Sequence, residues 1–258
     1  MEDRPEALTS DSLQVKEADS SSGPELPDKG GSVLRRGIRS YALRAGRMTD
    51  FQKSSYETLA VRWCIPFRAG ESFDPDPLYR RSAPLIVEVG FGMGAATAQI
   101  AASLPGMNFL GIEVHTPGVG KLLSEIEKQG LANLRILHHD AVEFLETCVR
   151  TGTVSGFHVF FPDPWPKKRH HKRRLIQRPL TDLLASRLKP GGYIYFVTDW
   201  EDYALWARDA LDSTPGLVNK FPGVWADRAA WRPVTKFESR ALREGRKIRE
   251  LWYERDPA

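Results

Sequence analysis

The sequence contains few of the residues that hold together disulfide-rich or metal-binding proteins. Its only two cysteines, Cys64 and Cys148, lie far apart and form neither a CxxC motif nor a zinc-ligand spacing. The adjacent histidine pairs at 138–139 and 170–171 have no HExxH or Cys–His spacing. We therefore expect no structural disulfide, as is typical of a reducing compartment. The same spacings predict no metal site.

Long apolar runs are also absent. No stretch approaches the ~20 apolar residues that a helix needs to cross a bilayer. The first residues, MEDRPEALTSDSLQV, lack the apolar core of a signal peptide. The sequence therefore predicts a cytoplasmic protein without a membrane span. Its length of 258 residues, with 41% hydrophobic residues, is enough for one core.

Acidic residues are concentrated at the beginning of the chain. Residues 1–32 hold eight acidic and three basic residues, a net charge of −5, and since the whole chain carries +4, the remainder carries +9. We predict a disordered acidic tail over 1–33, because this Ser-, Gly- and Pro-rich segment offers little apolar surface to offset the entropy of ordering. The folded domain is expected over 34–258, and its positive charge favours a polyanionic partner. Five arginines in 35–49 form either a solvated arm or an arm that contacts phosphate.

From residue 85 onward, apolar strands alternate with helical patterns. This alternation predicts an α/β fold with a parallel sheet covered on both faces, whose ligands bind at the carboxyl ends of the strands. The expected strands are 85–90, 107–114, 134–138, 156–161, 191–198 and 248–255. The expected helices are 94–104, 117–130 after a Thr116 cap, 141–149, 173–188 with a break near Pro179, 200–211 and 235–245.

A glycine-rich turn, VEVGFGMGAA (87–96), joins the first strand to its helix. Gly90 and Gly92 allow a tight turn and the close approach of a ligand. With Ala95 they also fit the GxGxxA pattern of dinucleotide-binding enzymes, which leaves an NAD-dependent oxidoreductase as an alternative. Glu88, however, interrupts the apolar strand, and a pyrophosphate favours a site without a nearby anion.

Acidic residues stand at the ends of four successive strands: Glu88, Glu113, Asp140 and Asp163. The topology gathers them around one crevice, which favours a ligand with cationic groups and a ribose, such as S-adenosylmethionine. In this interpretation Glu113 accepts hydrogen bonds from the ribose hydroxyls, and Asp140 accepts one from the adenine amino group. Glu88 binds the methionine ammonium. Asp140 with Glu143 also has capping-box spacing, and Glu113 also fits a surface strand end.

The most distinctive stretch is VFFPDPWPKKRHHKRRLIQ (159–177), in which Asp163 precedes eight consecutive basic or histidine residues, 167–174. Three prolines stiffen the loop around Asp163. The basic run fits either contact with RNA phosphates or a solvated helix start, and positive charge at a helix N-terminus is unfavourable, which favours the RNA interpretation. Trp165 either stacks on a base or packs beneath the loop.

Several motifs together resemble the bacterial tRNA (guanine-N7-)-methyltransferases. They are EVGFGMG (88–94), GIEVHTPGVGKLL (111–123), FPDPWPKKRHHKRRLIQ (161–177), TDW (198–200) and RPVTKFESR (232–240). The similarity spans about Arg35 to Arg255. It implies a Rossmann-like class I methyltransferase domain over 34–258, with a mostly parallel seven-stranded sheet and helices on both faces. It also implies that S-adenosylmethionine is used to methylate N7 of guanosine 46 in the variable loop of tRNA. We expect a monomer.

The resemblance also assigns site residues. Asp163 is expected to be catalytic, and the cofactor-binding residues are Glu88, Gly90, Gly92, Glu113, Asp140 and Asp163. The expected tRNA-binding residues are Lys167, Arg169, His170, His171, Lys172, Arg173, Arg174, Asp199, Thr235, Lys236, Phe237 and Glu238. By spacing alone, Thr198 with Glu201 predicts a capping box that leaves Asp199 free to point into the crevice. A non-catalytic RNA-binding protein remains a further alternative.

Guanine N7 carries an in-plane lone pair and no proton, so its methylation needs no general base. The enzyme's work is mainly to align the reacting atoms and to stabilise the changing charge. We expect the Asp163 carboxylate to accept hydrogen bonds from the guanine N1–H and amino group, which selects guanine and favours its growing positive charge.

Overall fold

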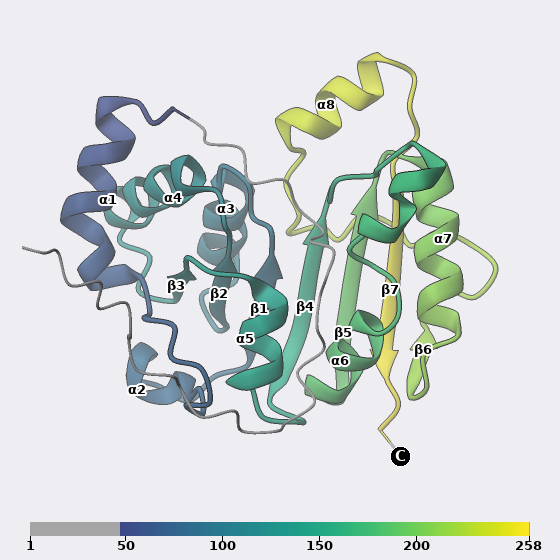
Figure 1. Ribbon diagram of the computed structural model, residues 1–258, viewed down its shortest axis with the longest axis horizontal. Helices are drawn as coiled ribbons and strands as arrows, with labels where there is room; N and C mark the ends of the chain where they lie inside the picture. Colours follow the sequence, from purple (N-terminus) through teal and green to yellow (C-terminus); the bar gives the residue numbers. More distant parts are fainter. Residues whose placement is uncertain (1–46, 258) are drawn as a thin grey trace, which may run out of the picture. The chain divides into compact units, whose positions relative to one another are not determined.

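A computed structural model of the chain describes residues 47–257 (Figure 1). The predicted acidic tail at 1–33 and most of the arginine-rich arm at 35–49 lie outside these residues. The described part contains a seven-stranded sheet with strand order β3-β2-β1-β4-β5-β7-β6. Its strands are β1 (Leu85–Val89), β2 (Asn108–Ile112), β3 (Leu134–Leu137), β4 (Val154–Phe160), β5 (Leu188–Thr198), β6 (Leu217–Asn219) and β7 (Arg249–Arg255).

Strands β1 to β5 all run parallel to one another. Strand β7 pairs antiparallel with both β5 and β6. The predicted Rossmann-like, mostly parallel sheet is therefore confirmed. Because β7 runs against β5, Thr198 at the end of β5 pairs with Arg249 at the start of β7. The carboxyl ends of the parallel strands and the beginning of β7 thus share one edge of the sheet.

Helices cover both faces of the sheet (Figure 1). One core contains side chains of α1, α3 and α4, and the other contains side chains of α5, α6 and α7. Figure 1 places α8 beyond the carboxyl end of β4. The helices are α1 (Asp50–Trp63), α2 (Pro75–Tyr79), α3 (Ala95–Ser103), α4 (Thr116–Gln129), α5 (Ala141–Thr147), α6 (Leu180–Arg187), α7 (Glu201–Asp212) and α8 (Lys236–Arg243), with a 3₁₀ helix at Lys168–Arg173.

Several predicted boundaries are wrong. The helix predicted over 173–188 begins only after Pro179, because the basic residues before it form the separate 3₁₀ helix. Thr116 is the first residue of α4 rather than its cap, and the preceding His115 caps it without a side-chain hydrogen bond. The capping box predicted for α7 does not form. Instead, the Trp200 N–H donates to Thr198 Oγ1 at 3.2 Å.

Three elements have no counterpart in the sequence prediction: α1, α2 and β6. Helix α1 begins with a Thr49–Gln52 capping box, but only Gln52, Ser55 and Trp63 of its fourteen residues are buried, so its apolar periodicity is weak. Helix α2 has five residues and β6 has three, which leaves little pattern to detect. No helix of residues 47–257 has both the length and the apolar character that a membrane crossing requires.

Candidate active site at the carboxyl ends of the strands

Glu88 is a buried carboxylate in the middle of the sheet. It lies in β1 between Gly111 of β2 and His158 of β4, and only 4% of its surface is exposed. Its Oε2 atom has no hydrogen-bond partner among the described residues. Burial raises the pKa of Glu88 to about 7; the nearby Thr97 hydroxyl opposes this rise, although it lies outside hydrogen-bond geometry, and the charge of Glu113 adds to it. A buried carboxylate oxygen without a donor is unfavourable by itself and favours a ligand that brings a donor or a positive charge.

The glycine-rich turn next to Glu88 is open to a ligand. Gly90 and Gly92 have φ angles of 79° and 60°, in the left-handed region that glycine tolerates best. No other side chain or distant backbone atom lies within 4 Å of the position that a Cβ would take at either residue. Helix α4 packs closely against the turn, because a Cβ added at its Gly118 would lie 1.9 Å from the main-chain oxygen of Gly92. Helix α4 therefore begins directly against this turn and holds it in place.

Glu113 follows β2 and is tied to the same turn. Its Oε2 accepts from Gly92 N at 2.8 Å, and its Oε1 accepts from Val114 N at 2.7 Å and His115 N at 2.9 Å. A carboxylate offers about four acceptor positions, so these three bonds leave about one. The side chain thus fixes the turn and retains the capacity to accept from a hydroxyl group of a ligand.

Asp140 follows β3 and caps α5. Its Oδ1 accepts from Val142 N at 2.8 Å and Glu143 N at 3.1 Å, which confirms the capping interpretation. The Glu143 side chain does not complete a capping box, because its carboxylate contacts His139 Nε2 at 2.9 Å. Glu88, Glu113 and Asp140 thus come from adjacent strands and lie at or near one sheet edge, as expected.

Asp163 lies three residues beyond β4 and is exposed. The loop that carries it is anchored at its start, where Phe161 N donates to Val197 O at 2.8 Å. Two non-glycine residues of this loop, Phe161 and Trp165, have positive φ angles of 49° and 47°. Such backbone geometry at bulky residues is strained and concentrates at functional sites.

The basic stretch after Asp163 divides into outward and inward side chains. Its exposed members are Lys167, Lys168, Arg169 and Lys172, and those partly buried are His170, His171 and Arg173. The Arg173 guanidinium lies over the Trp165 ring, 4.9 Å from its centroid, so this indole packs within its own loop. Arg174 is completely buried, and the prediction that it binds tRNA directly is therefore wrong for this structure.

Asp199 lies between β5 and α7, beside a cavity of about 670 Å³. Its Oδ2 is 2.7 Å from Arg246 Nη1, so the carboxylate is not free, in contrast to the prediction from the capping pattern. The residues that line this cavity are Asp199, Trp200, Glu201, Asp202, Leu205, Gly245, Arg246, Lys247 and Arg249.

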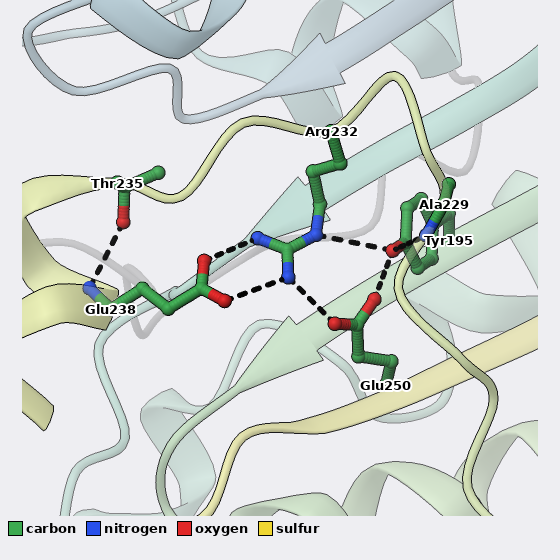
Figure 2. Close-up of polar contacts among 6 residues, drawn as sticks. All are labelled: Tyr195, Ala229, Arg232, Thr235, Glu238 and Glu250. Atoms are coloured by element: carbon green, nitrogen blue, oxygen red, sulfur yellow. Dashed lines mark hydrogen bonds and ion pairs between the residues drawn. The ribbon is translucent and has the colours of Figure 1, made fainter. Parts of the chain in front are cut away.

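A buried ionic network supports the start of α8 (Figure 2). Thr235 caps the helix and accepts from Glu238 N at 3.0 Å. The Glu238 carboxylate is 4% exposed and takes two hydrogen bonds from Arg232, at 2.7 and 3.1 Å. Arg232 also donates to Glu250 Oε1 at 2.6 Å and to the Tyr195 hydroxyl at 3.1 Å. The direct tRNA contact expected of Glu238 is wrong for this structure, because its carboxylate binds Arg232.

Hydrogen bonds stabilise the charged form of Arg232 against the cost of its burial. Burial alone lowers the pKa of Arg232, but the bonds to Glu238 and Glu250 outweigh it and hold the pKa above its ordinary value. The neighbouring Lys236 and Phe237 point outward, and Phe237 is 68% exposed. The buried ion pairs thus fix helix α8, and the helix presents these two side chains to solvent.

Sequence reasoning missed four residues that organise this edge: Tyr195, Asp202, Arg232 and Glu250. Arg232 stands within the RPVTKFESR motif, but neither its burial nor its pairing with Glu250, eighteen positions later, has a local signal. Among the described residues, no group of three or more His, Cys, Asp or Glu side chains is arranged to hold a metal ion.

Comparison with known proteins gives matches over most of the chain. The family described as "Putative methyltransferase" matches residues 82–251. A tRNA (guanine-N(7)-)-methyltransferase of Burkholderia cenocepacia is 50% identical over 227 residues, which cover 88% of each chain. Another, of Nitrosomonas eutropha, is 50% identical over 214 residues, which cover 83% of this chain and 95% of the relative. A third, of Bordetella parapertussis, is 46% identical over 242 residues, covering 94% and 93%.

A solved structure supports the fold. The 16S rRNA methyltransferase KamB superposes with a TM-score of 0.52 over 76% of this chain and 99% of that chain, at 17% identity. The match to residues 82–251 includes β1 to β5 with the acidic residues at their carboxyl ends and the glycine-rich turn. The chain therefore belongs to the tRNA (guanine-N7-)-methyltransferase family.

Proposed function

We propose that the chain transfers a methyl group from S-adenosylmethionine to N7 of guanosine 46 in the variable loop of tRNA. The observation that carries the proposal is the position of Glu88. Its buried, unpartnered carboxylate oxygen lies next to the open Gly90–Gly92 turn, at the edge where the exposed Asp163 and the basic stretch follow β4. The curated relatives named as tRNA (guanine-N(7)-)-methyltransferases support the choice of substrate.

The residues present suit the cofactor. Glu88 supplies a negative charge for the ammonium group, and the remaining acceptor capacity of Glu113 suits a ribose hydroxyl. We assign the adenine amino group to Asp140, which follows β3 and caps α5. When bound, S-adenosylmethionine supplies a methyl group activated by its sulfonium. The protein's contribution is to hold that group and to exclude other orientations.

On the substrate side, Asp163 is exposed at the tip of a strained, proline-rich loop. We propose that its carboxylate accepts hydrogen bonds from the guanine N1–H and amino group. A carboxylate in this position stabilises a base that becomes cationic. We assign the phosphates of the tRNA backbone to the exposed Lys167, Arg169 and Lys172. We also assign tRNA contacts to the exposed Lys236 and Phe237 of α8, which offer one further charge and one aromatic ring.

The test is methylation of two tRNA transcripts that differ only at position 46. Purified protein, labelled S-adenosylmethionine and the guanosine-46 transcript should yield 7-methylguanosine in nucleoside mass spectrometry, whereas the adenosine-46 transcript should yield none. Equal incorporation into both transcripts would contradict the position, and no incorporation into either, with tRNA binding retained, would contradict the activity and leave an RNA-binding protein.

A further inference from the structure

The last residue of the basic stretch, Arg174, has an environment unlike that of its neighbours. Its surface is 0% exposed, and it is among the largest fully buried side chains of residues 47–257. Its guanidinium carbon lies 5.1 Å from the ring centroids of both Tyr203 and Trp206, two residues of α7. A group in this position cannot reach an RNA phosphate.

The guanidinium joins two segments that both belong to the site. Its Nε donates to the Pro164 oxygen at 3.1 Å, and Pro164 is the residue next to Asp163. Its Nη2 donates a hydrogen bond to Asp202 Oδ2 in the first turn of α7. The same nitrogen donates to His171 Nε2 at 3.2 Å. The hydrogen bond from Arg174 lowers the pKa of Asp202.

The chain after Arg174 is fixed to the same helix. Ile176 N donates to the Tyr203 hydroxyl at 3.0 Å, and Trp206 Nε1 donates to Ile176 O at 3.1 Å. Helix α7 therefore acts as a common support for Arg174 and Ile176. Through Pro164 O, that support extends to the strained loop of Asp163.

We propose that Arg174 is a positioning residue for methyl transfer: it holds the Asp163 loop against α7 and makes no contact with tRNA. The inference rests on the proposed function, because it assigns to Arg174 the placement of the carboxylate that faces guanine. It also divides the basic stretch by role, with exposed residues for affinity and one buried arginine for geometry. A planar guanidinium with donors in a fixed fork suits this bridge, whereas a lysine ammonium cannot span both acceptors in the same way.

The decisive variant is Arg174→Lys, and Arg150→Lys is its matched control, since both changes conserve charge. Arg150 is exposed and precedes β4 at the amino-terminal end of the strands, so Arg150→Lys should leave the methylation rate, the tRNA affinity and its salt dependence at wild type. Arg174→Lys should also keep tRNA affinity, but its single-turnover rate at saturating tRNA should fall by about 10²-fold, the effect expected of a misplacement of about 1 Å. The rate is measured with labelled S-adenosylmethionine, and affinity by filter binding at several salt concentrations.

Asp202→Asn provides a second variant that removes no buried atoms, because the Asp202 side chain is 64% exposed, but it takes the negative charge away from the Arg174 guanidinium. It should lower the single-turnover rate in the same direction by a smaller factor, again with tRNA affinity retained. If Arg174→Lys does not unfold cooperatively in a thermal melt, Asp202→Asn decides. The inference is overturned if Arg174→Lys and Asp202→Asn methylate at the wild-type rate, or if their defect is a loss of tRNA affinity with a flatter salt dependence. A wild-type protein without methylation would instead contradict the proposed function.

Discussion

Arg232 holds Glu238 through two hydrogen bonds in a buried fork-to-fork pair. Both side chains are almost inaccessible, at 1% and 5% exposure, and Glu250 binds the same guanidinium from β7. The beginning of α8 is therefore fixed to the sheet by charge pairs from which solvent is excluded. Such pairs contribute little when intact but are costly to break.

Arg232→Met should destabilise the protein strongly, because two buried carboxylates lose their positive partner. The free energy of unfolding should fall by about 3–5 kcal/mol, measured by urea denaturation followed by circular dichroism. Arg240→Ala within α8 is the matched control, since the Arg240–Glu244 pair is exposed and screened by water. Equal effects of the two substitutions would show that the Arg232 network does not anchor α8.

Glu88 should make the ligand-free protein less stable as the pH rises. Its pKa is raised from 4.5 to about 7, so between these values the folded state holds a proton that the unfolded state has released. Stability therefore falls through this window and levels off above pH 7, by about 3 kcal/mol in total. The comparison is wild type against Glu88→Gln in urea titrations from pH 4.5 to 8. The variant should lack this component, and a parallel decline in both proteins would contradict it.

The same carboxylate should couple cofactor binding to pH. A cationic ligand favours ionised Glu88, so S-adenosylmethionine binding below pH 7 should release a proton and strengthen as the pH rises. Calorimetric titrations at pH 6 in two buffers of different ionisation enthalpy measure this release. Glu88→Gln should bind more weakly and release no proton at this site, and an unchanged proton release would assign it to another group.

Gly118→Ala should weaken cofactor binding although it replaces none of the proposed cofactor-binding residues. The added Cβ would lie 1.9 Å from the Gly92 oxygen, so the glycine-rich turn or the start of α4 must move. We expect a loss of S-adenosylmethionine affinity of about tenfold or more, since overpacking typically costs 1–3 kcal/mol. Gly106→Ala is the control, because nothing lies within 4 Å of its Cβ position and its φ is not positive. Equal affinities of the two variants would contradict the close contact as a support of the turn.

Arg169→Ala should reduce the salt dependence of tRNA binding. One lost phosphate contact lowers the slope of log affinity against log salt by about one unit or slightly less. Lys189→Ala is the control, because Lys189 is also exposed but lies at the start of β5, the opposite end from the site. If both substitutions flatten the slope equally, tRNA binding does not depend on the edge that carries Asp163.

The sequence predicted the sheet and the acidic residues at its edge because both follow from local patterns. Apolar runs of strand length mark β1, β2 and β4, and the motifs place Glu88 and Asp163 at their ends. The inward or outward direction of a charged side chain has no such pattern. Arg173 and Arg174 are adjacent and chemically identical, yet only Arg174 is buried, because only it reaches Pro164 O and Asp202. Likewise, the partner of Glu238 is set by the packing of α8 on the sheet rather than by spacing.

The position of β7 at the end of the element order also sets the order in which the site becomes complete during translation. When the ribosome has produced β1 to β5, the nascent chain already contains the acidic residues of the cofactor edge and the Asp163 loop. It still lacks Arg232, α8 and Glu250, which emerge later and then fold back beside β5. A chain in the process of synthesis is thus expected to acquire its cofactor half first, and to become competent toward tRNA only after β7 has inserted between β5 and β6.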